Sequence, residues 1–178
     1  MPKNSSAGPG RRSALPAAAA AVLVLLTGCS GGDDGVQVAA PATTGAATAQ
    51  CKALQALLPQ TLPGGQKRRA TSPSSDNTAA WGDPAITLRC GVAEPGVINI
   101  FSKTYDPSSV LSTVVDGVCW ITEQTSDNGF RFTAIKQQTY VEMDVPSAYN
   151  GQQAPVNGVS AQILKTDPTD SSKIFDCA

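Results

Sequence analysis

The sequence of 178 residues contains no histidine. This absence excludes Ser-His-Asp and Cys-His nucleophile schemes, and it excludes metal sites with a histidine ligand. Lys and Arg total 13 against 14 Asp and Glu, so there is no broad basic surface and nucleic acid is not an expected partner. The sequence also lacks the SxxK, KTG, GxSxG, GxGxxG and GxxxxGK motifs of common hydrolases and nucleotide-binding proteins. We therefore expect neither a cofactor nor a metal.

The N-terminal segment combines positive charge with a short apolar stretch. Lys3, Arg11 and Arg12 precede the apolar run Ala14–Leu26, and no acidic residue accompanies them. The run is shorter than the roughly 20 residues that a bilayer-spanning helix needs. A basic start, a short apolar core and small residues after it are typical of a secretory signal peptide, which we expect over residues 1–28.

The residues that follow this apolar core are Leu26-Thr27-Gly28-Cys29. They resemble the lipobox of bacterial lipoproteins, in which the cysteine carries two acyl chains (palmitate or a related lipid) and becomes the mature N-terminus. The alternative is a plain signal peptide with Cys29 as an ordinary thiol. The resemblance implies a protein held by Cys29 on the extracytoplasmic face of the cell membrane.

Cleavage before Cys29 would also change the charge of the chain. The 13 basic residues would lose three and leave 10 against 14 acidic ones, a formal charge of −4. An acidic domain is repelled by an anionic membrane, so stable attachment needs a covalent anchor, and two acyl chains suffice.

The segment after Cys29 is rich in Gly, Ala and Thr and has no aromatic residue. It buries too little apolar surface to offset the entropy of ordering it, so we expect a flexible tether over residues 29–50. All the aromatic residues lie beyond residue 80, and we expect one folded domain over residues 51–178.

Hydrophobic periodicity within that domain predicts mostly strands between two helices. An Asn-Gly turn at residues 126–129 separates two of the strands and predicts a hairpin. We expect an α+β fold, an antiparallel sheet of about four to five strands with two helices packed on one face. The predicted helices are residues 51–58 and 156–164, and the predicted strands are 86–90, 97–101, 118–125, 130–134 and 140–145.

With Cys29 assigned to lipid, four cysteines remain, namely Cys51, Cys90, Cys119 and Cys177. An even number in an exported chain predicts two disulfides, for which three connectivities exist. We favour Cys90–Cys119, because both lie in predicted strands, together with Cys51–Cys177, which would tie both ends of the domain.

Several segments resemble a known family. They are Ala80–Val92 (AWGDPAITLRCGV), Cys51 with Leu57-Leu58-Pro59, Asp116–Trp120 (DGVCW) and Val141–Pro146 (VEMDVP). Together they resemble the small actinobacterial lipoproteins grouped as domain of unknown function 3515, over most of residues 51–165. The family has no assigned activity, so the resemblance implies an envelope location and a fold class but no mechanism. The position of Cys119 just before the tryptophan suits a pairing with Cys90.

Five side chains are candidates for ligand binding. Trp81 and Trp120 would stack on a sugar or anchor a partner if exposed, or fill the core if buried. Asp83 would act as an acid, a base or a ligand, or would accept backbone N–H bonds within its turn. Arg89 and Arg131 point to the outward face of their strands, as binding groups or as members of cross-strand charge pairs.

No residue of the sequence is assigned a catalytic role. We expect a membrane-anchored, non-enzymatic domain that binds or supports an envelope protein or glycan. One alternative is a carboxylate-dependent, carbohydrate-modifying hydrolase, which would need two acidic side chains in a pocket. The other is a structural spacer without a ligand.

Overall fold

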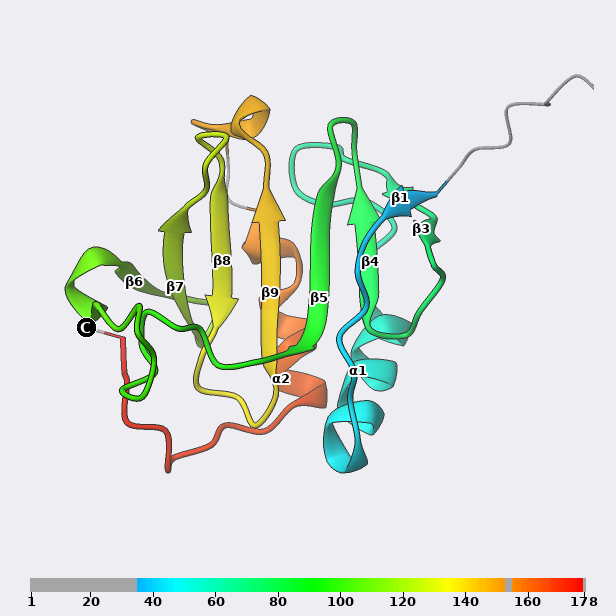
Figure 1. Cartoon of the computed structure of the whole chain (residues 1–178). Coiled ribbons are helices and arrows are strands. Elements are labelled where there is room, and N and C mark those ends of the chain that lie inside the picture. The colour runs from blue at the N-terminus through cyan, green and yellow to red at the C-terminus, as the bar shows by residue number, and fades with distance from the viewer. Residues whose placement is uncertain (1–34, 153–154, 178) are drawn as a thin grey trace, which may run out of the picture. The chain divides into compact units, whose positions relative to one another are not determined.

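The computed structural model describes residues 35–152 and 155–177, so Cys29 and the expected signal peptide lie outside the described residues. Figure 1 shows the helices beside a broad sheet. The elements are β1 (Val36–Gln37), α1 (Gly45–Leu57), β2 (Arg68–Arg69), β3 (Thr71–Ser72), β4 (Thr78–Trp81), β5 (Ile86–Val92), β6 (Leu111–Val115), β7 (Val118–Gln124), β8 (Phe130–Ala134), β9 (Tyr140–Val145) and α2 (Ser160–Thr166), with short 3₁₀ turns at Pro107–Ser109, Ser147–Tyr149 and Pro155–Gly158.

The main sheet has seven antiparallel strands in the order β2-β4-β5-β9-β8-β7-β6, and β1 and β3 form a separate parallel pair. The expected fold class is therefore wrong, because the chain is mostly β and its sheet is larger than four to five strands. Three strands of the main sheet, β2, β4 and β6, were not expected. Residues 97–101 form turns instead of a strand, because Pro95 and Gly96 start a turn in which Ile98 N–H donates to Pro95 C=O at 3.1 Å.

Two tight turns connect strands β6, β7 and β8. The expected turn at residues 126–129 is confirmed, with Asn128 at a φ of 61° between β7 and β8. A second turn, Asp116-Gly117, joins β6 to β7 with φ values of 48° and 82°. Positive φ at both central residues is the geometry that favours Asp-Gly in a two-residue hairpin.

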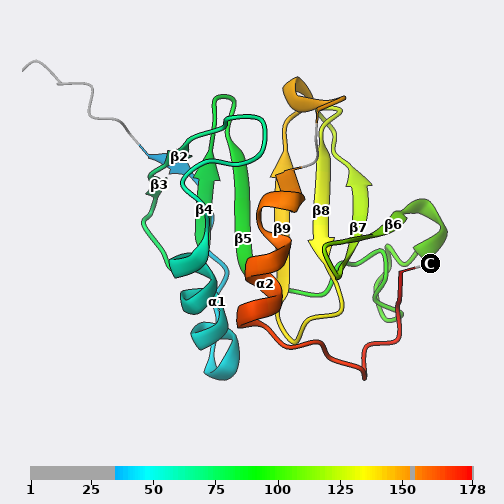
Figure 2. The ribbon, with the colours of Figure 1, turned by 180° about the vertical axis from the view of Figure 1, so that it is seen from behind.

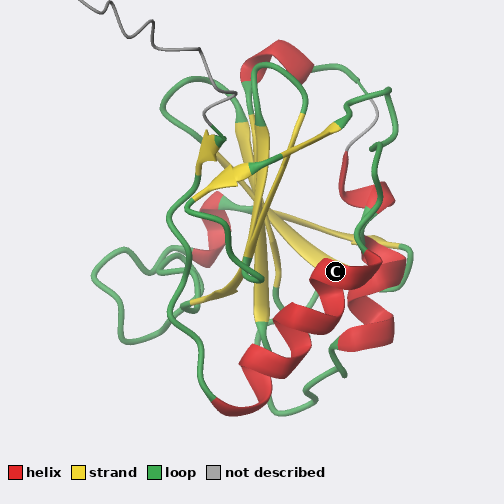
Figure 3. Cartoon of the chain, turned by 90° about the vertical axis from the view of Figure 1, so that its right-hand side faces the viewer, coloured by secondary structure: helices red, strands yellow, loops and turns green. Residues whose placement is uncertain are grey.

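Both helices lie on the same side of the sheet, as Figures 2 and 3 show. The helix predicted at 156–164 is confirmed only in its second half, because Pro155–Gly158 is a 3₁₀ turn and α2 begins at Ser160. Helix α1 begins at Gly45, so part of the expected tether belongs to the folded domain. The main core fills the space between helices and sheet and includes Cys51, Leu54, Trp81, Ile86, Leu88, Cys90, Trp120, Val141, Met143, Val156, Val159 and Ile163.

The opposite face of the sheet carries a smaller core. Its buried members are Val97, Ile98, Cys119, Ile121 and Ile135. The long connection between β5 and β6 and the C-terminal tail lie over this face (Figure 1). Apolar groups are therefore buried on both faces of the sheet, and a simple helix-on-sheet arrangement does not describe the domain.

Two disulfides are present, as expected, but the favoured pairing is wrong. The bonds are Cys51–Cys90 and Cys119–Cys177, each with Cα atoms 5.6 Å apart. Cys90 on β5 and Cys119 on β7 are separated by strands β9 and β8, and they belong to the cores on opposite faces. Strands lie about 4.8 Å apart, so these two cysteines are too distant to bond.

Candidate functional site

Two irregular segments enclose a groove on the face of the sheet opposite the helices. One is the β5–β6 connection, whose backbone folds on itself where Asp106 N–H donates to Val97 C=O at 3.0 Å. The other is the C-terminal tail, which runs beside the segment before β9. Asp170 N–H donates to Lys136 C=O at 2.6 Å, and Lys136 Nζ donates to Lys173 C=O at 2.8 Å. The Cys119–Cys177 bond fastens the end of the tail to β7.

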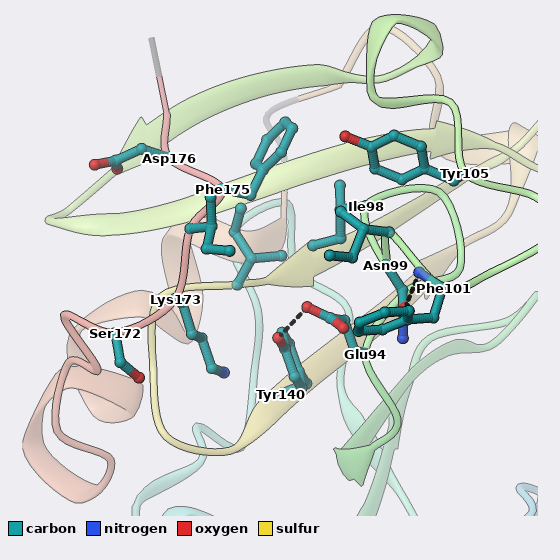
Figure 4. Close-up of a pocket in the computed structure, with 13 residues that line it drawn as sticks. Glu94, Ile98, Asn99, Phe101, Tyr105, Tyr140, Ser172, Lys173, Phe175 and Asp176 are labelled. Atoms are coloured by element: carbon teal, nitrogen blue, oxygen red, sulfur yellow. Dashed lines mark hydrogen bonds between the residues drawn. The ribbon is translucent and has the colours of Figure 1, made fainter.

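The space between these segments has a volume of about 480 Å³. This volume lies within the range of pockets that hold small ligands or side chains of a partner, roughly 300–1,000 Å³. Figure 4 shows the side chains that converge on it from the connection, the tail and β9. We call it the apolar groove, and its lining residues are Glu94, Ile98, Asn99, Ile100, Phe101, Tyr105, Ile135, Tyr140, Ser172, Lys173, Ile174, Phe175 and Asp176.

Large apolar side chains on both walls of the apolar groove face solvent. Phe101 on one wall and Ile174 on the other are each 90 % exposed, and Ile100 and Tyr105 are also exposed. Isolated exposed apolar residues are common on proteins, but a cluster around a groove indicates an interaction surface.

Polar side chains at one end of the apolar groove bond to one another. Tyr140 O–H donates to Glu94 Oε1 at 3.0 Å, and Lys173 Nζ lies 3.4 Å from the centre of the Tyr140 ring and donates to Gln137 C=O. Burial is the main cause of the raised pKa of Tyr140, and the nearby Glu94 carboxylate adds to it. Burial lowers the pKa of Lys173, although the nearby carboxylates act in the opposite direction. Because these groups already have partners, the free surface of the groove is mainly apolar.

Arg89 and Arg131 belong to a ladder of charges across β5, β9 and β8. Arg89 NH2 lies 2.7 Å from Glu142, and Arg131 makes two hydrogen bonds to Asp144, at 2.7 and 2.9 Å. Arg131 also lies 3.4 Å from Glu142, which is only 7 % exposed. The bonds to Asp144 are the main cause of the raised pKa of Arg131. Cross-strand pairing therefore accounts for both arginines, which lie outside the apolar groove.

The other three predicted candidates also lie outside it. Trp81 and Trp120 are fully buried, and their indole N–H groups donate to Pro59 C=O at 2.9 Å and to Ser160 Oγ at 3.1 Å. Asp83 is exposed and lies 3.6 Å from Arg69. Among residues 35–152 and 155–177, no backbone N–H donates to the Asp83 carboxylate, so the expected hydrogen bond within the turn is not found.

Sequence reasoning missed the apolar groove entirely. One signal was available in the tail, where Ile174 and Phe175 stand in an otherwise polar stretch just before Cys177. A second was the run Ile98–Phe101, which is predicted as part of a strand although Pro95-Gly96 precedes it.

Two further observations concern the described residues alone. None of their helices combines the length and the apolar character needed to cross a bilayer. Within the same residues, no three side chains of the metal-binding types Cys, Asp and Glu come together in a suitable cluster.

Comparison with known proteins gives one result. A family model described as "Protein of unknown function (DUF3515)" matches residues 14–171. No curated protein and no solved structure matches the chain significantly. Because the match covers most of its length, the chain belongs to the DUF3515 family.

Proposed function

We propose that this protein is a lipid-anchored, extracytoplasmic lipoprotein whose apolar groove binds an apolar segment of another envelope protein, without catalysing a reaction. The observation that carries the binding role is the cluster of exposed apolar side chains on both walls of the groove, with Phe101 and Ile174 each 90 % exposed. Leaving such side chains in water is unfavourable, and a partner that covers them gains that free energy.

The proposed location draws support from two features. The N-terminal sequence has the pattern of a signal peptide ending in a lipobox at Cys29, as in the actinobacterial lipoproteins that the chain resembles. Two disulfides in a small domain are typical of proteins that fold in an oxidising compartment outside the cytoplasm.

The chemistry of the groove favours a protein over a glycan or an anionic lipid. Glu94, Tyr140 and Lys173 are bonded within the groove, which leaves few polar groups for the hydroxyls of a sugar. Asp176 at the rim lies 3.7 Å from Lys136, so this ion pair offers an anionic headgroup no net positive charge. A protein segment with large apolar side chains would complement the walls of the groove.

The hydrolase alternative gains no support from the positions of its candidate residues. Trp81 and Trp120 are fully buried and cannot stack on a sugar. Glu142 and Asp144 are held in salt bridges with arginine. A spacer role would leave the exposed apolar walls of the groove without a purpose.

The test is crosslinking of the full-length protein in its native host. Ile174→Asp places a charge on the groove wall, and Leu57→Asp is the matched control, because Leu57 is exposed on α1 away from the groove. We expect an envelope protein whose crosslinking falls about tenfold or more with Ile174→Asp, as for an apolar anchor, and is unchanged with Leu57→Asp. The groove-binding role is wrong if no protein shows this difference.

The anchor is tested separately. We expect Cys29→Ala to move the protein from the membrane fraction to the soluble fraction, and mass spectrometry of the wild type to find acyl chains on Cys29. An unacylated Cys29 in the native host would reject the lipid anchor and leave the groove proposal standing.

A further inference from the structure

The two edges of the main sheet differ in length and protection. At one edge, β2 has only two residues, and short edge strands resist unwanted pairing. At the other edge, β6 has five residues, Leu-Ser-Thr-Val-Val, with no charged residue and no proline. Leu111 and Val114 on this strand are 78 % and 58 % exposed. Three usual protections of an edge strand, namely shortness, charge and proline, are therefore missing from β6.

The hairpin fixes which backbone groups of β6 point away from the sheet. Val115 and Val118 flank the two-residue turn, so they exchange backbone hydrogen bonds with each other. Along an antiparallel pair of strands, residue pairs that exchange such bonds alternate with pairs that do not. Leu111, Thr113 and Val115 therefore bond to β7. Ser112 and Val114 direct their N–H and C=O groups to the open edge, and neither residue takes part in the backbone hydrogen bonds found elsewhere in the described residues.

We propose that β6 pairs with β6 of a second copy, in antiparallel orientation around a two-fold axis at Thr113. In this register Ser112 of each copy lies opposite Val114 of the other, and the outward N–H and C=O groups of both residues find partners. Leu111 lies beside Val115 of the other copy, which covers its exposed side chain. The strand carries no charge, so two identical edges meet without repulsion.

A second copy fits this edge better than an unrelated strand, because the edge is complementary to itself. The two outward-facing residues are placed symmetrically about Thr113, and a two-fold axis at that point satisfies both at once. The pairing would join two seven-stranded sheets into one continuous sheet. It does not involve the walls of the apolar groove, and it does not rest on the proposed function.

The position of the axis is tested by introducing single cysteines into the full-length protein in its native host. Thr113→Cys places the two new thiols opposite each other at the axis, so we expect a disulfide-linked dimer on a non-reducing gel. Leu111→Cys is the matched control, because its mate across the interface is Val115, and we expect no link. The proposal is overturned if Thr113→Cys gives no dimer, or if Leu111→Cys links equally well.

A second experiment does not depend on added thiols. We expect amine-reactive crosslinking of the wild type in intact membranes to give a dimer band that Val114→Lys abolishes by placing a charge at the edge. Ile174→Lys, at an exposed site on the groove wall, should keep the band. A wild type that stays monomeric, or equal loss in both variants, would contradict pairing through β6.

Discussion

At the scale of single residues, Asp167 is a buried carboxyl group that lies outside the apolar groove. It follows α2 and is only 3 % exposed, and its carboxylate accepts hydrogen bonds from Thr139 N–H at 3.0 and 3.3 Å. Burial raises the pKa of Asp167 to about 6, although the bond from Thr139 and the charge of Lys173 act in the opposite direction. The folded state therefore favours the protonated carboxyl group.

This preference has a definite sign for stability. The carboxyl group ionises near its ordinary pKa of 3.8 in the unfolded chain and near 6 in the folded one. Its contribution to the free energy of unfolding therefore falls as the pH rises from about 4 to about 6, and stays low above that range.

We predict that Asp167→Asn removes this dependence, since the amide does not ionise and its oxygen can still accept from Thr139. The free energy of unfolding of the variant, relative to the wild type, should improve by about 1–3 kcal/mol between pH 4 and pH 7. Urea denaturation at the two pH values measures the change, and NMR titration of the Asp167 carboxyl carbon gives the midpoint directly. An equal difference at both pH values would contradict the prediction.

At the scale of elements, the segment before α1 packs closely on the sheet although its composition predicts a tether. Asn77 Nδ2 donates to Pro41 C=O at 2.8 Å and to Thr43 Oγ1 at 3.1 Å. A Cβ atom added at Gly91, in the irregular part of β5, would collide with the methyl group of Thr43. The contacts with Asn77 and Gly91, together with the burial of Val38, therefore order a stretch that has few apolar residues.

We predict that Gly91→Ala destabilises the domain by about 1–3 kcal/mol more than Gly65→Ala, through overpacking against Thr43. The comparison is matched, because φ is 86° at Gly91 and 87° at Gly65, and an added Cβ at Gly65 meets nothing within 4 Å. Denaturant unfolding measures both variants.

The methyl group of Thr43 can be tested on its own. Thr43→Ser keeps the hydroxyl group and removes the methyl group, so it should restore most of the stability lost in Gly91→Ala. Equal losses at the two glycines, or no rescue by Thr43→Ser, would show that this segment does not pack on β5.

Local sequence predicted those elements whose alternation or turn chemistry is strong. Strands β5, β7, β8 and β9, the Asn128 turn and α2 all follow from such patterns. Strand β6 was missed because its exposed Leu111 and Val114 break the alternation, although Asp116-Gly117 is itself a hairpin signal. The apolar groove could not be predicted, because it depends on where the tail lies across the sheet, which local pattern does not encode.

At the scale of the whole molecule, the two disulfides have separate tasks. Cys51–Cys90 joins α1 to β5 inside the main core, where both cysteines are buried. Cys119–Cys177 holds the tail that forms one wall of the apolar groove. The favoured pairing is wrong because two things decide which cysteines can meet: the order of the strands and the face of the sheet on which each cysteine lies. Both depend on long-range contacts.

We predict different local effects when each bond is removed. Either loss should lower the free energy of unfolding by about 2–4 kcal/mol. Only the double variant Cys119→Ala with Cys177→Ala should speed hydrogen exchange in the tail at residues 170–177, since the tail then loses its covalent link to β7. The double variant Cys51→Ala with Cys90→Ala serves as the control. If hydrogen exchange in the tail rises equally in both double variants, Cys119–Cys177 is not what holds the tail.

The order of the four cysteines along the chain also decides what a single proteolytic cut would do. The rings closed by the two bonds follow one another without overlap, and residues 91–118 connect them. That connection includes the exposed Phe101. One cleavage there leaves two fragments with no covalent link, held together by pairing between β5 and β9, by polar contacts such as the Arg89–Glu142 ion pair, and by core contacts. The fragments would remain associated in native buffer and migrate separately in detergent without any reducing agent.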